Sequence, residues 1–372
     1  MKWVFWISVA VIGYTYVGYV GWLWLRARFR PRPIYRAPYV PQISVLMVVR
    51  NEERNLPAKI ENLTSLHYPP NKIEFIVVSD GSSDKTPEIL SQISDPRFRV
   101  LVLPESCGKA AGLNQELEIA KGEIIVFTDA RQQIEPDAFR LLMENFADPL
   151  VGCASGELML GHPHAGEVSQ GMGLYWRIEK TIRDLESASG SVIGATGALY
   201  AARRALLRAI PPDTILDDVY LPMEIVRQGH RVVFDGRARA WDSPNLGGKR
   251  EFARKVRTLS GNYQLLEIAP WLLTAKNPVR FEFVSHKLLR LAIPFALAAA
   301  FIASFVVPQP LYRLAMLLQF LFYFLSVLGL IPLKRGPLAR ISDAALVFVV
   351  LNSAALVAFM NFVTGRRAVW VR

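Results

Sequence analysis

The clearest pattern in the chain is a pair of uninterrupted apolar runs that each end in an aspartate. Residues 74–80 read Glu-Phe-Ile-Val-Val-Ser-Asp, and residues 123–129 read Glu-Ile-Ile-Val-Phe-Thr-Asp. Runs of β-branched and aromatic residues without polar alternation are typical of strands buried on both faces, as in parallel sheets. Ligands of such sheets bind beyond the carboxyl ends of the strands. We therefore expect Asp80 and Asp129 to project into one crevice, where two carboxylates suit a nucleotide and the metal that accompanies its phosphates.

Strand and helix patterns alternate through the first half of the middle region. The pattern predicts strands at 43–49 and 98–103 beside the two above, and helices at 53–65, 87–93 and 108–120. Strand, helix and strand repeated in this order indicate right-handed crossovers and a mostly parallel, doubly wound α/β sheet. The second half is less regular, with helices expected at 168–185, 219–227 and from about 249, and a glycine-rich stretch at 190–197.

Four long stretches without charged residues flank this region, at 3–25, 291–307, 314–333 and 344–365. A membrane-spanning helix needs roughly 20 apolar residues, and the second stretch reaches that length if Arg290 snorkels its charge to the interface. The chain is therefore expected to have one N-terminal and two to three C-terminal transmembrane helices. The predicted division is a transmembrane helix at 1–26, a polar α/β domain at 41–262, an interfacial segment at 263–286, and a membrane region at 287–372 with helices near 287–307, 313–333 and 343–365.

Basic residues predict the orientation of these helices. Residues 26–32 are arginine-rich and residues 334–340 are basic, so the positive-inside rule places both, and the polar α/β domain, in the cytoplasm beneath the plasma (inner) membrane. A fourth crossing would carry the basic tail at 366–372 outside, against that bias. Either the tail violates the rule, or the last segment, which Asn352 and Asn361 make less hydrophobic, does not fully cross the membrane. The sequence leaves both alternatives open.

The composition of the chain favours some classes of binding partner over others. The 372 residues carry a formal net charge of +11 from 43 basic and 32 acidic side chains, and 52% of residues are hydrophobic. Much of the basic surplus lies beside the apolar stretches, which favours membrane lipid as a partner over nucleic acid. Cys107 and Cys153 form no metal-binding spacing and suggest a reducing compartment.

Five short motifs carry a resemblance to a known family. In chain order they are Val49-Arg50-Asn51-Glu52, Asp80-Gly81-Ser82-Ser83-Asp84-Lys85-Thr86, Gly108-Lys109-Ala110-Ala111-Gly112-Leu113-Asn114, Thr128-Asp129-Ala130-Arg131 and Asp217-Asp218. Together they resemble a membrane-bound family 2 glycosyltransferase of the polysaccharide and cell-wall type, with a nucleotide-diphospho-sugar transferase (GT-A) fold. The resemblance covers residues 41–280 and extends to the flanking helices.

The resemblance implies a nucleotide-sugar pocket. Its expected members are Glu52, Asp80 on the base or ribose, Asp84 beside it, and Lys109 near the diphosphate. Asp84 could equally be a helix cap, and Lys109 a surface lysine. Asp129 matches the element that holds ribose and a divalent cation, Mg²⁺ or Mn²⁺, which takes oxygen ligands and bridges phosphates.

The sequence departs from the family at the third position of that element, where Arg131 replaces an aspartate. Asp129 could hold the metal with the diphosphate and water supplying the other oxygens. Alternatively, Arg131 could take over part of the charge neutralisation, because guanidinium binds phosphate bidentately. The retained metal is the preferred expectation.

The pair Asp217-Asp218 resembles the family's catalytic acidic element, in which Asp218 is the general base. Inverting transfer needs a carboxylate that removes the acceptor hydroxyl's proton as its oxygen attacks the anomeric carbon. The same pair would also suit a helix N-terminus. Gly194 and Gly197 are expected to let the backbone approach the acceptor or sugar.

A basic helix follows the acidic pair. Arg250, Arg254 and Arg257 share one face, which suits a diphosphate clamp or a cationic face on anionic headgroups. Related enzymes have a Gln-x-x-Arg-Trp element here that helps processive synthases hold the growing chain. Thr258 stands where its tryptophan is expected, which favours a single-addition enzyme.

The expected function is an inverting glycosyltransferase that moves a sugar from a nucleotide-sugar, most simply a UDP-sugar, to a lipid-linked or membrane-associated glycan. The enzymatic rival is a processive polysaccharide synthase. A rival of another class is a non-catalytic nucleotide-binding subunit working with other glycan-assembly or export proteins.

Overall fold

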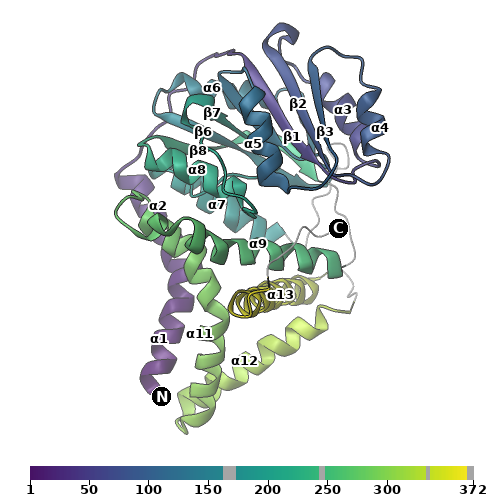
Figure 1. Cartoon of the computed structure of the whole chain (residues 1–372). Helices are drawn as coiled ribbons and strands as arrows, with labels where there is room; N and C mark the ends of the chain where they lie inside the picture. The colour runs from purple at the N-terminus through teal and green to yellow at the C-terminus, as the bar shows by residue number, and fades with distance from the viewer. Residues whose placement is uncertain (162–172, 243–247, 332–335, 367–372) are drawn as a thin grey trace.

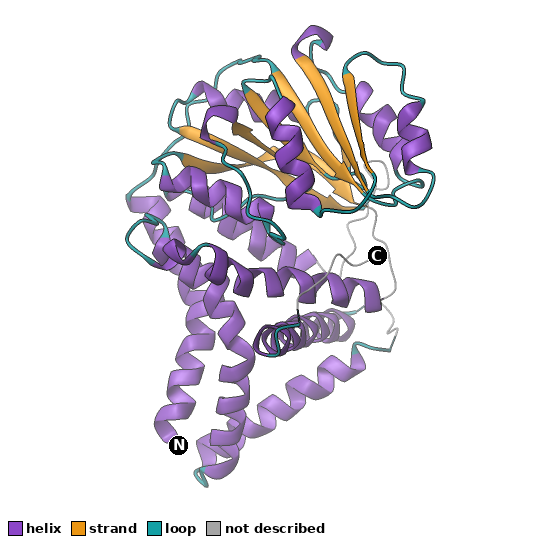
Figure 2. Ribbon diagram, viewed as in Figure 1, coloured by secondary structure: helices purple, strands orange, loops and turns teal. Residues whose placement is uncertain are grey.

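The computed structural model describes residues 1–161, 173–242, 248–331 and 336–366. A layered α/β domain stands on a group of long helices, and the N-terminus lies at the end of that group farthest from the sheet (Figures 1 and 2). The domain and the helix group correspond to the polar middle and the apolar flanks of the sequence.

Within the described residues one eight-stranded sheet runs in the order β3-β2-β1-β4-β7-β6-β8-β5. The strands are β1 (Ile43–Val49), β2 (Ile73–Asp80), β3 (Phe98–Leu103), β4 (Ile124–Thr128), β5 (Gln133–Ile134), β6 (Val151–Leu160), β7 (Leu199–Arg203) and β8 (Arg231–Asp242). The first four strands are mutually parallel, and β7 pairs antiparallel with both β4 and β6. The sheet is thus parallel through its first half and mixed through its second, in agreement with the change of pattern in the sequence.

The helices alternate with these strands and then continue alone. In chain order they are α1 (Lys2–Gly13), α2 (Tyr19–Phe29), α3 (Leu56–Thr64), α4 (Thr86–Ser91), α5 (Lys109–Ile119), α6 (Ala138–Glu144), α7 (Gly173–Ser189), α8 (Asp217–Arg227), α9 (Gly248–Ile268), α10 (Arg280–Phe283), α11 (Leu289–Val306), α12 (Pro310–Leu328) and α13 (Pro337–Val363). One-turn π segments join α1 to α2 and α10 to α11.

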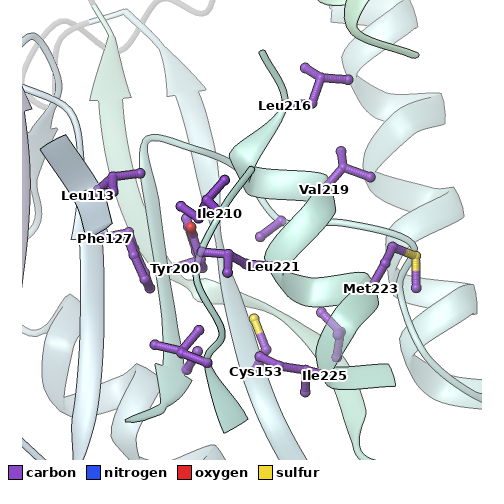
Figure 3. Close-up of a cluster of buried hydrophobic side chains, with 14 of the residues drawn as sticks. Leu113, Phe127, Cys153, Tyr200, Ile210, Leu216, Val219, Leu221, Met223 and Ile225 are labelled. Atoms are coloured by element: carbon purple, nitrogen blue, oxygen red, sulfur yellow. The ribbon is translucent and has the colours of Figure 1, made fainter. Parts of the chain in front are cut away.

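Two buried apolar clusters lie on the two faces of the sheet. Figure 3 shows part of one of them, where α8 packs over Tyr200 and Cys153 of the sheet through Leu221 and Ile225. Burying this much apolar surface is the main driving force for folding. It also fixes α8, whose first residues are the Asp217-Asp218 pair, against the sheet.

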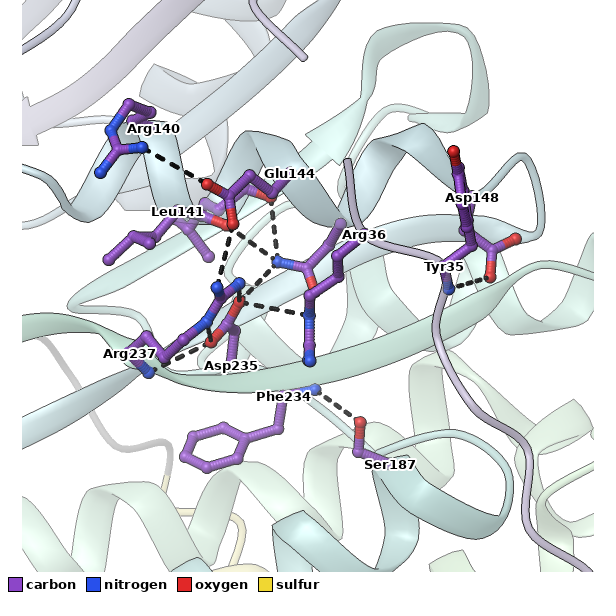
Figure 4. A network of polar contacts seen from close by, with 12 residues as sticks. Tyr35, Arg36, Arg140, Leu141, Glu144, Asp148, Ser187, Phe234, Asp235 and Arg237 are labelled. Carbon is purple, nitrogen blue, oxygen red and sulfur yellow. Dashed lines mark hydrogen bonds and ion pairs between the residues drawn. The ribbon is translucent and has the colours of Figure 1, made fainter. Parts of the chain in front are cut away.

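The segment between α2 and β1 is held on the surface of the sheet domain by a polar network (Figure 4). Arg36 donates to Asn145 over 2.8 Å and lies 3.7 Å from Asp235, which also binds Arg237. The backbone nitrogen of Tyr35 donates to Asp148. These contacts fix the first apolar helix relative to the catalytic domain.

In the part of the chain that the structure describes, four helical segments are long and apolar enough to cross a membrane by length and composition: Lys2–Phe29, Arg280–Val306, Pro310–Leu328 and Pro337–Val363. One is N-terminal and three are C-terminal, as expected from the sequence. The expected limit at residue 262 falls inside α9, which continues to Ile268, and the second candidate span already begins at Arg280.

Candidate active site

The loops that follow β1 and β2 are joined at the carboxyl edge of the sheet. The side-chain oxygen of Asn51 accepts a hydrogen bond from the backbone of Ser83 over 2.8 Å, and Asn51 has a positive φ of 55°. Asp84 accepts from the backbones of Glu53 (3.1 Å) and Thr86 (3.0 Å). Asp84 thus lies one residue before Lys85, the N-cap of α4, and its hydrogen bonds join the start of this helix to the loop after β1.

Asp80 organises the loop that precedes α5. Its carboxylate accepts hydrogen bonds from the backbone nitrogens of Cys107 (2.7 Å) and Gly108 (3.1 Å) and from the Ser106 hydroxyl (2.8 Å). The side chain is fully buried. Gly81 must be glycine, because a Cβ there would lie 2.3 Å from the Ser106 nitrogen. Asp80 thus supports the wall of the site, and the loop that it holds places Lys109.

Lys109 is the first residue of α5 and connects two carboxylates. Its Nζ lies 3.0 Å from Oδ1 of Asp129 and 3.4 Å from Oδ2 of Asp217. Burial alone would lower the pKa of Lys109, but Asp129 and Asp217 outweigh it and raise that pKa. Lys109 is therefore a charged residue of the site rather than the surface lysine that the sequence left open.

Asp129 and Asp218 face the same glycine. The backbone nitrogen of Gly197 donates to Oδ2 of Asp218 over 3.1 Å. A Cβ built on Gly197 would lie 3.4 Å from that oxygen and 3.7 Å from Oδ2 of Asp129. Both carboxylates therefore lie within 3.7 Å of one point. Asp218 thus meets Asp129, whereas Asp80, which the strand-end pattern expected in the same crevice, is absent from this pair and holds a loop instead.

The electrostatics of Asp218 suit a base. Burial and the neighbouring Asp217 carboxylate raise the pKa of Asp218 to about 6, while the cation of Lys109 opposes the shift. A carboxylate with such a pKa is a stronger proton acceptor than an ordinary aspartate and is still ionised at neutral pH.

A pocket of about 640 Å³ connects these groups. Its polar lining includes Glu52, Lys109, Asp129, Arg131, Gly197, Asp217, Asp218, Arg254 and Arg257. Its apolar lining includes Leu158, Ile215, Leu216, Leu259 and Leu351. Nine of the predicted site residues thus line one cavity.

Three predicted site residues, Asp80, Asp84 and Gly194, do not belong to that described lining. Asp80 and Asp84 hold loops, as above. Gly194 adopts a φ of 147°, and a Cβ there would lie 3.1 Å from Val219. The next nitrogen, that of Ala195, donates to the carbonyl of Asp218 over 2.7 Å. Gly194 therefore supports the start of α8.

Arg131 is engaged by a partner that the sequence reasoning did not single out. Its Nη2 lies 2.8 Å from Oδ2 of Asp242, the last residue of β8, and Arg254 lies 3.6 Å from the same oxygen. The other oxygen of Asp242, Oδ1, is buried and has no hydrogen-bond partner among the residues that the structure describes. No comparable sequence signal marks Asp242, because charged residues interrupt the run that precedes it.

The residues present fit a divalent cation in one way only. Among the described residues no group of three or more histidines, cysteines or carboxylates could enclose a metal. Asp129 is half-exposed in the pocket, and Mg²⁺ is commonly held by one or two carboxylates together with substrate phosphates. Asp129 would hold the ion with the diphosphate, and the ion would neutralise the charge of the leaving group.

Lys59 is another residue that the sequence reasoning missed. It is 1% exposed on α3, and its Nζ donates to Oγ1 of Thr128 (3.0 Å) and to the carbonyl of Gln132 (2.8 Å). Burial lowers its pKa to about 7. The signal was its place between Leu56 and Leu63 on the apolar face of α3. Through these two hydrogen bonds Lys59 holds both ends of the segment that carries Asp129 and Arg131.

Comparison with known proteins agrees with this geometry. Residues 44–210 match the Glycosyl transferase family 2 model. The chain is 25% identical over 254 residues to a poly-beta-1,6-N-acetyl-D-glucosamine synthase of Staphylococcus aureus, which covers 65% of this chain and 60% of that protein. It is 27% identical over 230 residues to a beta-monoglucosyldiacylglycerol synthase of a Nostoc species, which covers 59% of this chain and 49% of that protein. The match thus spans less than two thirds of either relative.

A solved structure matches almost the whole chain. The mannosyltransferase PcManGT from Pyrobaculum calidifontis, in complex with GDP-Man and Mn²⁺, superposes with a TM-score of 0.75 at 23% identity and covers 98% of this chain and 99% of that one. At this identity the likeness shows the fold alone. Residues 44–210 therefore match a family 2 glycosyltransferase domain, and the chain has the GT-A fold.

Proposed function

We propose that the protein is an inverting glycosyltransferase that moves a sugar from a nucleotide-sugar, with a UDP-sugar as the first expectation, to a lipid-linked or membrane-associated acceptor. The observation that carries the proposal is the convergence of Lys109, Asp129, Asp217 and Asp218 on one pocket. A cation and a half-exposed carboxylate suit the donor's diphosphate and its metal, and the raised pKa of Asp218 suits a base.

In the proposed reaction Asp218 accepts the proton of the acceptor hydroxyl. The hydroxyl oxygen forms a bond to the anomeric carbon, while the bond from that carbon to the diphosphate breaks on the opposite face. The nucleoside diphosphate leaves with the electron pair, and the anomeric configuration inverts. Gly197 holds Asp218 through its backbone nitrogen, and Arg254 and Arg257 from α9 would stabilise the departing phosphates.

Position relative to the membrane supports the acceptor class. The pocket is lined both by the sheet domain and by Leu351 of an apolar helix. An acceptor held in the same membrane would meet the site in two dimensions, which raises its effective concentration. The proposed location is the plasma (inner) membrane, with the catalytic domain in the cytoplasm beside the arginines of residues 26–32.

The test is a donor screen with the purified full chain. UDP- and GDP-sugars are incubated with membrane lipid extract in Mn²⁺, Mg²⁺ or chelator, and nucleoside diphosphate release and labelled lipid are measured. Transfer from at least one donor with inversion, established by NMR of the product, supports the proposal. Nucleotide binding without transfer or hydrolysis, unchanged by Asp218→Asn, would support the non-catalytic rival instead.

A processive synthase is the second candidate, because one of the relatives is named as a polysaccharide synthase. Thr258, which lines the pocket where the processive element has tryptophan, favours single addition. Size analysis of the product from a single donor separates the two, since a ladder of polymer lengths would favour the synthase.

A further inference from the structure

Helix α13 has the length and hydropathy of a membrane span but a different direction from the spans beside it. It is 27 residues long and apolar enough to cross a membrane by length and composition. In Figure 1, α1 and α11 run side by side down the page, whereas α13 is seen end-on between α9 and α12. Helix α13 therefore runs crosswise to α1 and α11, and a flat bilayer crossed by those two cannot also be crossed by α13.

Contacts along α13 agree with this direction. Leu351, at its middle, lines the catalytic pocket with Thr258 and Leu259 of α9. Phe362, near its end, stacks on Tyr263 of α9 with ring centroids 5.1 Å apart. A helix that crossed the membrane would carry its end away from the catalytic domain. Both the middle and the end of α13 instead contact the same helix of that domain.

The opposite side of α13 rests on the spanning helices. Phe348 packs against Tyr16 of the first span and Phe322 of α12, and Phe359 packs against Phe295 of α11. Helix α13 thus contacts α9 and three other helices. Several of its large apolar side chains remain exposed, so the apolar surface of α13 suits contact with lipid as well as with these helices.

The charge conflict in the sequence disappears with this arrangement. Three crossings, by α1–α2, α11 and α12, return the chain to the side of the catalytic domain. Because α13 then stays on that side, Arg366 at its end remains with the other basic segments, as the positive-inside rule requires.

The pocket beside α13 is polar at one end and apolar at the other. Asp218 and Lys109 lie at the polar end, and Leu216, Leu259 and Leu351 supply apolar lining. An acceptor with a hydroxyl near Asp218 and a hydrocarbon chain against Leu351 would match both parts. A water-soluble sugar would leave the apolar part without a partner.

We propose that α13 lies in the membrane parallel to its surface, and that its Leu351 side is the wall of the catalytic pocket against which the acceptor's hydrocarbon chain packs. The orientation is independent of the activity, whereas the role of Leu351 rests on the proposed function. Two experiments separate these parts.

The first experiment measures depth. A nitroxide is attached to a non-natural side chain at Ile341 or at Met360, both more than half exposed near opposite ends of α13, in the full chain in vesicles. Oxygen and nickel accessibility in electron paramagnetic resonance then give the depth of each label. We expect similar depths. A crossing helix would separate the two labels by roughly 28 Å, at 1.5 Å per residue, and that result would overturn the orientation.

The second experiment narrows the apolar end of the pocket. Leu351→Trp is compared with Leu356→Trp, a matched change at a site on α13 that is 44% exposed. We expect Leu351→Trp to raise the apparent KM for dioleoylglycerol, a lipid with a free hydroxyl, about tenfold, and to change the apparent KM for the nucleotide-sugar much less. Leu356→Trp should leave both values unchanged.

Equal KM values for the two variants would overturn the role of Leu351. A protein that neither transfers nor hydrolyses any donor before mutation would contradict the proposed function instead, and the depth measurement would still decide the orientation.

Discussion

At the scale of single residues, the site depends on a lysine that stands between carboxylates. Lys109 lies within 3.4 Å of Asp129 and Asp217, and it opposes the upward pKa shift of Asp218. Removing this cation would leave the three carboxylates to repel one another. The raised pKa of Asp218 and the opposing charge of Lys109 give two predictions about the pH dependence of transfer.

The first concerns the pH dependence of transfer. Asp218 must be ionised to accept a proton, and its pKa is raised to about 6. We expect kcat to rise with pH through about 6 and to reach a plateau above it. A pH profile of kcat at saturating donor, with a donor of constant ionisation, measures this limb. A limb near 4, or none, would contradict the raised pKa.

The second concerns Lys109→Gln. Because Lys109 lowers the pKa of Asp218, its loss should raise that pKa, and the acidic limb should move to higher pH. Lys121→Gln, at an exposed lysine beyond the end of α5, is the control and should leave the limb in place. If the pH at which kcat rises were unchanged in Lys109→Gln, the charge of Lys109 would have no effect on the pKa of Asp218.

The contacts of Arg131 indicate which group neutralises the charge of the leaving diphosphate. Its guanidinium is bound by Asp242, which favours a retained metal over a direct phosphate role. We therefore expect chelation to abolish transfer, Mn²⁺ or Mg²⁺ to restore it, and Arg131→Gln to keep this metal dependence. Activity of the unmodified protein in chelator would contradict this and favour Arg131 itself as the neutralising group.

At the scale of elements, sequence patterns predicted the strands best. The runs that became β1 and β3 have the predicted limits, and Asp129 lines the pocket, whereas Asp80, expected beside it, holds a loop instead. The β1 run is buried along its whole length, which explains its nearly apolar sequence, whereas β3 is only partly buried. The role of Asp80 was not predictable, because the local sequence around an aspartate at a strand end is the same whether its side chain binds a ligand or supports a loop.

Close packing of α5 on β1 gives an element-scale prediction. A Cβ on Gly112 would lie 2.9 Å from both γ-methyl groups of Val48. Gly112→Ala should push α5 and Lys109 away from the sheet and lower the free energy of unfolding by about 1–3 kcal/mol. Thermal unfolding in detergent measures the loss. An unchanged midpoint would mean that Val48 can move at no cost.

At the scale of the whole molecule, a buried polar cluster joins the catalytic domain to the membrane helices. Glu186 of α7 accepts a hydrogen bond from Tyr19 of the first span (2.7 Å) and contacts His286 of the second (2.9 Å). His286 also contacts Glu179 of α7 over 3.2 Å. No local sequence pattern predicted this junction, since its members lie on three separate helices and each is an isolated polar residue.

Loss of one member should therefore weaken the whole assembly. Glu186→Ala leaves Tyr19 and His286 without this buried partner, and breaking such a group typically costs about 3–5 kcal/mol. We expect a clear fall in the unfolding midpoint of the full chain in detergent, whereas Glu118→Ala, at an exposed position of α5, should leave it unchanged. Equal midpoints would show that the junction does not stabilise the assembly.

The central claim is that Asp218 is the base in a pocket whose donor contacts come from other residues. The most direct measurement compares unmodified protein with Asp218→Asn for nucleotide-sugar Kd by calorimetry and for transfer rate with the same donor. We predict an unchanged Kd and a transfer rate lower by roughly 10²- to 10⁴-fold. Transfer by Asp218→Asn at the unmodified rate would contradict the claim.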